Sequence, residues 1–225
     1  MQKLAIYDMD RTITVRGTYT PFLLHMVMAI APWRLLLLPL LPFGFIGYGL
    51  KLISRKGLKT YNQRLLLGSH PAVSKLQPHI DNYADQTIRK NSFKQAFQQI
   101  EQDREEGRLL ILATASYELY VNAIAKRLGF DHVIATRLEI NDQGQVLPKI
   151  IGENCYDTAK LDRIQAFLDD QNLDRAQLHI RAYSDHVSDA PMMDFADEAV
   201  ATTPSSAMRT LARKRGWKIV DWDPV

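Results

Sequence analysis

The fold of this chain is decided by the stretch LAIYDMDRT, residues 4–12. Its first half, Leu4–Tyr7, is a short and continuous apolar run, which is typical of a strand buried in a parallel sheet. Two carboxylates follow directly, Asp8 and Asp10, and their i, i+2 spacing lets both project toward one point. Ligands of open α/β sheets gather at the carboxyl ends of the strands. The stretch therefore predicts a buried first strand with an acidic site at its end.

Two carboxylates in such a position can divide the work of phosphate transfer. One can attack phosphorus while the other protonates the leaving oxygen. Both are negative, so they repel an anionic phosphate unless a cation offsets their charge. Carboxylate oxygens are hard ligands that suit Mg²⁺. An Asp-x-Asp pair is common in surface turns, but its placement directly after an N-terminal buried strand favours a phosphate site with Mg²⁺ as the cofactor.

Apolar runs and helical patterns alternate along most of the chain. Strands are expected at 4–7, 109–113, 131–140, 145–147, 178–183 and 198–201, with a turn at 141–144. Helices are expected at 157–169, 190–196 and 205–215. This alternation indicates an α/β domain with a mostly parallel sheet. Because three strands end in Asp8, Thr114 and Asp185, these side chains are expected to meet at one edge of the sheet.

Residues 16–104 interrupt the alternation. They contain no clear strand and have helical patterns throughout, so they are expected to form an inserted helical cap domain. The catalytic core would then consist of residues 1–15 and 105–225. An inserted cap of this kind would lie beside the acidic strand ends of the core.

The first part of the predicted cap, residues 21–53, is unusually apolar. Residues 35–50 carry no charge, but the run is broken by Pro39 and Pro42 and is shorter than the roughly 20 residues of a membrane-spanning helix. Basic residues flank it and could anchor it at lipid headgroups. These observations favour an interfacial or re-entrant hairpin. The alternative is that the segment forms the buried core of a helical cap. The flanking basic residues are Arg34, Lys51, Arg55 and Lys56.

The charge distribution is strongly asymmetric. The 225 residues carry a net charge of +3, yet the stretch from Arg11 to Ile80 contains nine Lys or Arg residues and no Asp or Glu, so the remainder carries −6. A one-sided field favours an anionic partner, which could be a phosphorylated substrate, an acidic membrane surface or nucleic acid. Nucleic acid is disfavoured, because the basic region has no interleaved aromatic platform and no recognised motif. A solvated basic face without a partner is the alternative.

The cysteine content and the N-terminus bear on the compartment. The single cysteine, Cys155, excludes an internal disulfide and fits a reducing environment. Residues 1–3 run straight into the first strand, which leaves no room for a signal peptide. We therefore expect a cytoplasmic protein, with a peripheral position at the inner face of the membrane as an extension of the lipid hypothesis.

Three further features could complete a phosphate site. The strand at 109–113 runs into Thr114-Ala115-Ser116, where a hydroxyl and free backbone N–H groups before a helix could cradle phosphate. Lys160 lies early in the next predicted helix and could offset phosphate charge. The strand at 178–183 runs into an acidic loop with Asp185 and Asp189, which could supply further Mg²⁺ ligands.

In this order, the four features resemble the motifs of the haloacid dehalogenase superfamily. Within it, they resemble the phosphatases that have a helical cap and belong to the phosphoserine phosphatase-like branch. The resemblance implies a Rossmann-like parallel sheet flanked by helices, with an inserted all-helical cap. It implies that Asp8 is the nucleophile and Asp10 the general acid and base. It further implies phosphate binding by Thr114, Ala115 and Lys160, and Mg²⁺ binding by Asp8, Asp10, Asp185 and Asp189.

Two residues depart from the superfamily pattern. Arg11 replaces the glycine that many relatives carry after the second Asp, and Ser184 replaces the usual glycine before Asp185. Neither change removes a reacting group, so the activity class is expected to stand.

The substrate class is open at this stage. Phosphoserine phosphatases place an acid shortly after the first motif to hold the substrate ammonium, whereas residues 12–20 contain none. The apolar, cation-flanked cap resembles that of phosphatidylglycerophosphatase C, which implies a lipid phosphate such as phosphatidylglycerophosphate. A soluble metabolite of the phosphoserine or histidinol phosphate type is the alternative. A non-catalytic binding module is a further alternative, disfavoured because all the reacting groups are present.

Overall fold

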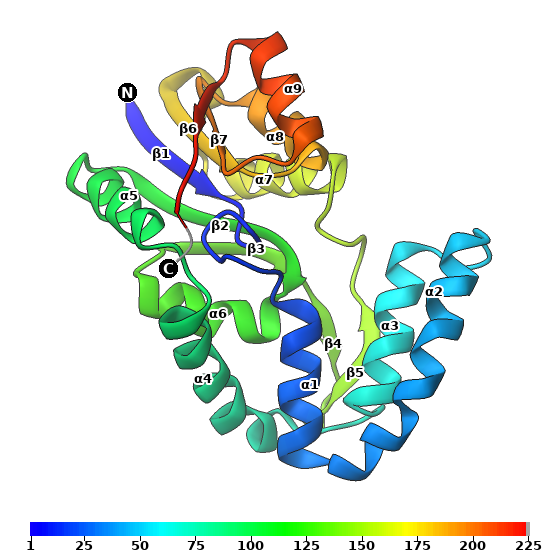
Figure 1. Ribbon diagram of the computed structural model, residues 1–225. Helices are drawn as coiled ribbons and strands as arrows, with labels where there is room; N and C mark the ends of the chain where they lie inside the picture. Colours follow the sequence, from blue (N-terminus) through cyan, green and yellow to red (C-terminus); the bar gives the residue numbers. More distant parts are fainter. Residues whose placement is uncertain (224–225) are drawn as a thin grey trace.

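A computed structural model describes residues 1–223 of the protein. Six parallel strands form the main sheet, and helices cover both of its faces (Figure 1). The predicted Rossmann-like α/β fold is therefore confirmed. In spatial order the strands are β3 (His132–Thr136), β2 (Leu109–Tyr117), β1 (Gln2–Tyr7), β6 (Leu178–Ser184), β7 (Glu198–Thr202) and β8 (Lys218–Val220).

The first strand is central because both of its faces are apolar. It pairs in parallel with β2 on one side and with β6 on the other. Ala5 and Tyr7 point into one buried hydrophobic cluster, while Leu4 and Ile6 point into a second cluster on the opposite face. A strand buried on both faces shows a continuous apolar run rather than an alternating one, which explains the pattern of residues 4–7.

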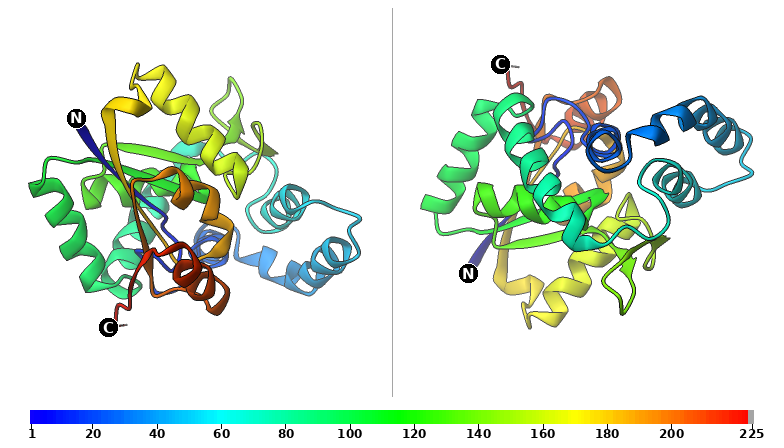
Figure 2. Two further views of the ribbon diagram at one scale, coloured as in Figure 1. Left: turned by 90° about the horizontal axis from the view of Figure 1, so that it is seen from above. Right: turned by 90° about the horizontal axis from the view of Figure 1, so that it is seen from below.

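The two faces carry different helices (Figure 2). On one face, α5 (Lys94–Glu105) and α6 (Glu118–Leu128) pack on the sheet, and α4 (Val73–Lys90) packs against α6. The other face is covered by α7 (Thr158–Asp170), α8 (Ala190–Phe195) and α9 (Ser206–Arg215). Short 3₁₀ turns, η2 (Arg175–Gln177) and η3 (Val187–Asp189), precede and follow β6.

The structure corrects the strand prediction in two places. Residues 131–140 do not form one strand: β3 joins the main sheet, and after Arg137 the chain leaves it as β4 (Leu138–Ile140). This strand pairs with β5 (Val146–Ile150) in a separate antiparallel hairpin, closed by the predicted turn at 141–144. The short edge strand β8 was not predicted.

The helices of residues 16–104 are of two kinds. The helices α4 and α5 cover the core, whereas α1 (Tyr19–Ile30), η1 (Pro32–Leu40), α2 (Leu41–Gly49) and α3 (Arg55–Leu66) pack mainly on one another to one side of it (Figure 1). The region is helical, as predicted. Its division from the core at residues 15 and 104 stays a prediction, and that division would assign α5 to the cap although α5 lies on the sheet.

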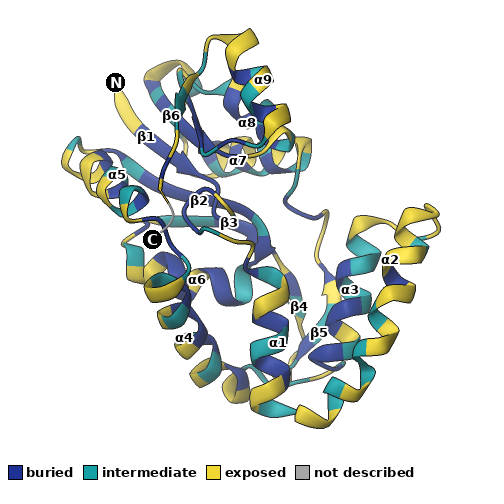
Figure 3. Ribbon diagram, viewed as in Figure 1, coloured by how far each residue is buried: buried dark blue, intermediate teal, exposed yellow. Residues whose placement is uncertain are grey.

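The apolar segment 21–53 is partly buried and partly exposed. Helix α1 buries Phe22, Leu23, Met26 and Val27, so this part is core. By contrast, η1 buries no residue and α2 buries only Gly44, and both are largely exposed (Figure 3). Within residues 1–223, no helix combines the length and apolar character that crossing a membrane requires.

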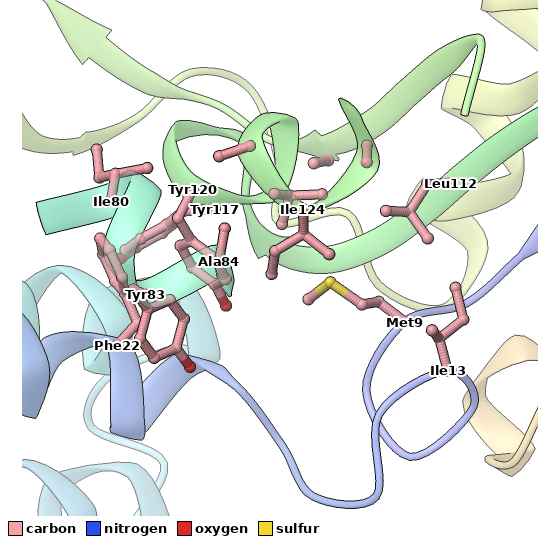
Figure 4. Close-up of a cluster of buried hydrophobic side chains, with 14 of the residues drawn as sticks. Met9, Ile13, Phe22, Ile80, Tyr83, Ala84, Leu112, Tyr117, Tyr120 and Ile124 are labelled. Carbon is pink, nitrogen blue, oxygen red and sulfur yellow. The ribbon is translucent and has the colours of Figure 1, made fainter. Parts of the chain in front are cut away.

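A cluster of aromatic side chains joins α1 to the core (Figure 4). Phe22 of α1 stacks on Tyr120 of α6 at 4.3 Å between ring centroids, and Tyr83 of α4 contacts both rings edge-on. In the same hydrophobic cluster, Met9 and Ile13 anchor the loop that follows β1. Dense packing of this kind holds the loop that carries Asp8 and Asp10 in one position.

Candidate active site

Asp8 lies at the carboxyl end of the central strand, and its side chain is buried. Lys160 Nζ, near the start of α7, donates a hydrogen bond to Asp8 Oδ1 at 2.8 Å, and Thr12 Oγ1 donates to Asp8 Oδ2 at 3.3 Å. The Asp8 backbone N–H donates to the carbonyl of Tyr183 on β6 at 3.0 Å. Two strands and one helix therefore fix the orientation of this carboxylate.

The buried carboxylate of Asp103, on α5, links β1 to β6 through two tyrosine side chains. The rings of Tyr7 and Tyr183 stack at 4.2 Å, and their hydroxyls donate to Asp103 Oδ2 of α5 at 2.5 and 2.8 Å. Tyr7 directly precedes Asp8, and Tyr183 lies two residues before Asp185. This link to α5 helps to hold the two acidic strand ends in register.

Asp10 is oriented by three donors. Its Oδ1 accepts hydrogen bonds from the backbone N–H and the hydroxyl of Thr18, both at 2.7 Å. Its Oδ2 accepts from Ser116 Oγ at 2.7 Å. Thr18 directly precedes α1 and Ser116 lies near the end of β2, so the Asp10 carboxylate links these two elements.

The end of β2 carries Thr114 and Ala115, the two residues of this strand that are predicted to bind phosphate. Thr114 is buried, and its Oγ1 accepts a hydrogen bond from the Ser116 backbone N–H at 3.2 Å. The pairing of β2 with β3 is irregular between Ala113 and Tyr117, which frees backbone groups of this stretch from the sheet. The Ala115 carbonyl accepts a hydrogen bond from Thr136 Oγ1 at 2.8 Å. The irregularity is a β-bulge-like feature, which often occurs next to active sites.

The acidic loop after β6 forms an ion pair with Lys160. Asp189 Oδ1 lies 2.8 Å from Lys160 Nζ, and Asp189 Oδ2 accepts from Ser184 Oγ at 2.7 Å. The Asp185 backbone N–H donates to Thr12 Oγ1 at 3.1 Å, so Thr12 bridges Asp185 and Asp8. Ser184, at the position where the superfamily pattern has glycine, thus helps to hold Asp189 in place.

All seven residues predicted from the sequence line one cavity of about 290 Å³. The strand-end residues therefore meet at one edge, as the parallel topology requires, while their chemical roles stay predictions. A larger cavity of about 550 Å³ lies between α4, α6 and the β4–β5 hairpin and contains none of these residues. The seven residues are Asp8, Asp10, Thr114, Ala115, Lys160, Asp185 and Asp189.

The electrostatics of the smaller cavity are unbalanced. Asp8, Asp185 and Asp189 are buried there with Lys160 as the buried cation among them. Burial raises the pKa of Asp8 to about 8, although the Lys160 ammonium opposes the shift. Burial and the Asp189 charge raise the pKa of Asp185 to about 7. For Lys160, burial alone would lower the pKa, but the Asp189 and Asp8 carboxylates outweigh it and raise the pKa, so the amine stays charged.

The donor set fits a divalent cation that completes its coordination with phosphate and water. In residues 1–223, no three Asp, Glu, His or Cys side chains form a ready-made metal cluster. The carboxylates of Asp10 and Asp189 are already engaged by hydroxyl and ammonium donors. The one buried ammonium, Lys160, pairs with both Asp8 and Asp189, so the three buried carboxylates outnumber the buried cation, and within residues 1–223 Asp185 has no salt-bridge partner. Mg²⁺ commonly uses one or two carboxylates together with substrate phosphate and waters, and this arrangement fits that pattern.

The cavity also contains residues that sequence reasoning did not assign. Arg55, the first residue of α3, lines the cavity with its guanidinium 3.7 Å above the Tyr156 ring. Thr12, the last residue of the stretch 4–12, and Thr18 bind the catalytic candidates, but the sequence assigned neither of them a role. The basic character of residues 11–80 was the available signal for Arg55. His186 lines the cavity from an exposed position in the loop after β6.

Comparison with known proteins identifies the family of the chain. The model of the haloacid dehalogenase-like hydrolase family matches residues 5–194. Phosphoserine phosphatase SerB1 of Mycobacterium tuberculosis is 36% identical over 121 residues, which cover 52% of this chain and 37% of that protein. The chain therefore spans well under half the length of this curated relative.

Solved structures show the same fold at low identity. A Bordetella pertussis protein of unknown function superposes with a TM-score of 0.84 at 23% identity, covering 98% of this chain and 99% of its own. A substrate-bound phosphoserine phosphatase superposes with a TM-score of 0.64 at 16% identity, covering 100% and 94%. The family match extends over β1, β2, α7 and β6, the four elements that carry the site residues, and the chain belongs to the haloacid dehalogenase-like hydrolase family.

Proposed function

We propose that the protein is a Mg²⁺-dependent phosphatase that hydrolyses phosphate monoesters through an aspartyl-phosphate on Asp8. The observation that carries this proposal is the Asp8 carboxylate. It is held by Lys160 and Thr12 at the end of β1 and lines the cavity together with Asp10, Thr114 and Asp185. A nucleophile, an acid, phosphate donors and excess negative charge for a cation are thus combined in one place.

In the first step, an Asp8 oxygen attacks phosphorus and forms the new O–P bond as the ester O–P bond breaks. Asp10 donates a proton to the departing alcohol, so it must enter this step protonated. Its contacts to Thr18 and Ser116 hold the carboxyl group in place for that transfer. Lys160 and donors at Thr114 and Ala115 would offset the charge on the non-bridging phosphoryl oxygens.

In the second step, water attacks phosphorus of the aspartyl-phosphate and releases inorganic phosphate and the free Asp8 carboxylate. Asp10, left deprotonated by the first step, takes the proton of that water. Asp8 and Asp185, with the Asp10 backbone carbonyl, would hold Mg²⁺. When bound, the cation supplies positive charge that lets an anionic ester approach two carboxylates. Asp189 acts by holding Lys160, or as a ligand through water.

The proposed substrate class is a lipid phosphate such as phosphatidylglycerophosphate, reached by the protein from the cytoplasmic side of an anionic membrane. Two observations favour it. Residues 12–20 place no acid near the cavity to hold a substrate ammonium, and Arg55 adds a cation at its wall. The second candidate is a small soluble phosphate of the phosphoserine or histidinol phosphate type, which the name of the Mycobacterium tuberculosis relative favours.

The assay that tests the proposal measures phosphate release with Mg²⁺ from phosphatidylglycerophosphate, lysophosphatidate, phosphoserine, histidinol phosphate and a generic aryl phosphate. We expect release that EDTA abolishes and added Mg²⁺ restores. Asp8→Asn should remove activity, whereas Asp162→Asn, on the exposed side of α7, should leave it unchanged. Preference for the lipid esters supports the first substrate class and preference for a soluble ester the second. No release from folded, Mg²⁺-binding protein contradicts the phosphatase proposal.

A further inference from the structure

The cap carries a large exposed apolar surface, which we call the apolar tip and define as residues 32–52. Most monomeric proteins expose large apolar side chains singly, and contiguous patches mark interaction sites. Here the exposed side chains follow one another along η1, α2 and the loop after α2. Leu36 is 82% exposed and Leu52 is 76% exposed. The exposed residues are Trp33, Leu36, Leu40, Phe43, Phe45, Ile46, Tyr48, Leu50 and Leu52.

The tip is held in an outward-facing position by one glycine and one arginine. Gly44 is buried where α2 packs on α3, and a Cβ at that position would lie 2.6 Å from the Tyr61 ring. Contact through the glycine face leaves the bulky side chains of α2 directed away from the cap. Arg34 Nη1 donates to the carbonyls of Arg64 and Leu65 at 3.2 and 2.9 Å, which fixes η1 against the end of α3.

The surroundings of the tip are cationic. No acidic residue occurs from Arg11 to Ile80, and both Lys51, in the tip, and Arg55, three residues after it, are exposed. Within residues 1–223, the one salt bridge to a cation of this stretch joins Lys56 to Glu153 at 3.8 Å. An apolar surface with a rim of unneutralised cations fits a partner that is apolar inside and negative at its edge.

We infer that the apolar tip docks on the surface of an anionic lipid bilayer, with its large side chains among the acyl chains and Lys51 at the headgroups. Helix α2 has nine residues and is therefore about 14 Å long, which suits lying in the interface. A second copy of the chain would complement the apolar area but would bring like charges together. An anionic bilayer offers both an apolar interior and a negatively charged surface. Each basic residue near such a surface contributes about 1 kcal/mol to the free energy of binding.

Docking would also orient the cavity. Arg55 follows the tip by three residues and lines the cavity that contains Asp8. The tip would thus hold the wall of the cavity close to the lipid headgroups, where phosphate esters of lipids are displayed. This consequence for substrate choice rests on the proposed phosphatase function, whereas docking itself requires no catalysis.

The test is flotation of the full-length protein with vesicles of phosphatidylglycerol and phosphatidylcholine, compared with vesicles of phosphatidylcholine alone. We expect binding to the anionic vesicles that weakens as salt is added. The triple variant Leu36→Ser/Phe43→Ser/Leu52→Ser should bind about a hundredfold more weakly, since three large side chains no longer partition into lipid. Ile140→Ser, an exposed apolar residue of β4 outside the tip, is the matched control and should bind like the wild type.

Two readouts keep docking separate from catalysis. Asp8→Asn protein should float with anionic vesicles as the wild type does, and the triple variant should keep wild-type activity on a soluble aryl phosphate. Binding without turnover of any ester would contradict the phosphatase proposal and leave docking intact. Wild-type protein that ignores anionic vesicles would overturn the docking inference. So would sedimentation showing a dimer that the triple variant converts to monomer, because a second copy would then cover the tip.

Discussion

At the residue scale, Arg11 holds an unusual backbone conformation. Its φ is 65°, in the left-handed region where a residue with a Cβ is strained by roughly 1–2 kcal/mol. The turn lies directly after Asp10, and the Thr14 hydroxyl accepts the Arg11 backbone N–H at 3.3 Å. Glycine is the residue that this conformation suits best. Arg11 therefore keeps a cation beside the acidic site at some conformational cost.

Substitutions at Arg11 should rank by their tolerance of positive φ. Arg11→Gly is expected to be at least as stable as the wild type, because the strain it removes outweighs the extra freedom of glycine in the unfolded chain. Arg11→Val should lose about 1–2 kcal/mol, because a β-branched residue tolerates this conformation poorly. Urea denaturation of the three proteins measures the order. A valine variant as stable as the glycine variant would contradict the proposed strain.

Lys160 is the buried cation that makes the carboxylate cluster tolerable. Lys160→Met should lower the free energy of unfolding by about 3–5 kcal/mol, because it leaves Asp8 and Asp189 buried without a counter-ion. The double variant Lys160→Met/Asp8→Asn should recover part of the loss. Lys126→Met, at an exposed position on α6, is the matched control and should change little. Equal effects at positions 160 and 126 in chemical denaturation would argue against the buried pair.

At the element scale, α3 contacts the end of β2 and the loop before α7 through a buried lysine. Lys59 Nζ donates to the Ala115 carbonyl and to Asn154 Oδ1, the latter at 2.7 Å. Asn154 Oδ1 also accepts a hydrogen bond from Thr136 Oγ1 at 3.0 Å. Burial and the nearby Arg55 lower the pKa of Lys59 to about 7. One side chain of α3 therefore reaches the Ala115 carbonyl near the end of β2, at a free-energy cost that depends on whether its amine is protonated.

The pH dependence of stability should report that cost. In the unfolded chain the pKa of a lysine is about 10.4, so between about pH 7 and pH 10 the folded protein binds fewer protons at Lys59 than the unfolded chain does. The contribution of Lys59 to the free energy of unfolding should therefore rise with pH across this window. Lys59→Met should lack this rise, so the free energy of unfolding of the wild type should increase relative to that of the variant as the pH rises. Parallel pH profiles of the two proteins would contradict this.

The elements themselves were predictable to different degrees. The apolar run at residues 4–7 identified β1 because that strand is buried on both faces, whereas in β6 the buried Leu178, Ile180 and Ala182 alternate with half-buried residues. The division of residues 131–140 into β3 and β4 was missed, because the chain leaves the sheet at Arg137 without a glycine or proline to mark the break. The edge strand β8 has only three residues, too few for any periodicity.

At the scale of the whole molecule, parallel topology explains why the main site was predictable. Polar residues at the ends of neighbouring parallel strands must meet, so Asp8, Thr114 and Asp185 could be placed together from sequence. Arg55 and Tyr156 could not, because their contact depends on how α3 sits against the loop before α7. Sequence likewise left open whether residues 21–53 are buried or exposed. Tertiary packing decides it, burying the inner face of α1 and exposing η1 and α2.

The central claim concerns one covalent bond, between Asp8 and a phosphoryl group. The most direct test is to mix the enzyme with Mg²⁺ and the ester it hydrolyses best, quench in acid during turnover, and locate the phosphoryl group by peptide mass spectrometry. We predict phosphorylation of Asp8. With an ester that has a good leaving group, Asp10→Asn protein should still form the aspartyl-phosphate. A larger fraction of it should be trapped in this variant, because no base is present to activate the water that hydrolyses the intermediate. Turnover with Asp8 unmodified throughout, or with the phosphoryl group on another residue, would contradict the mechanism.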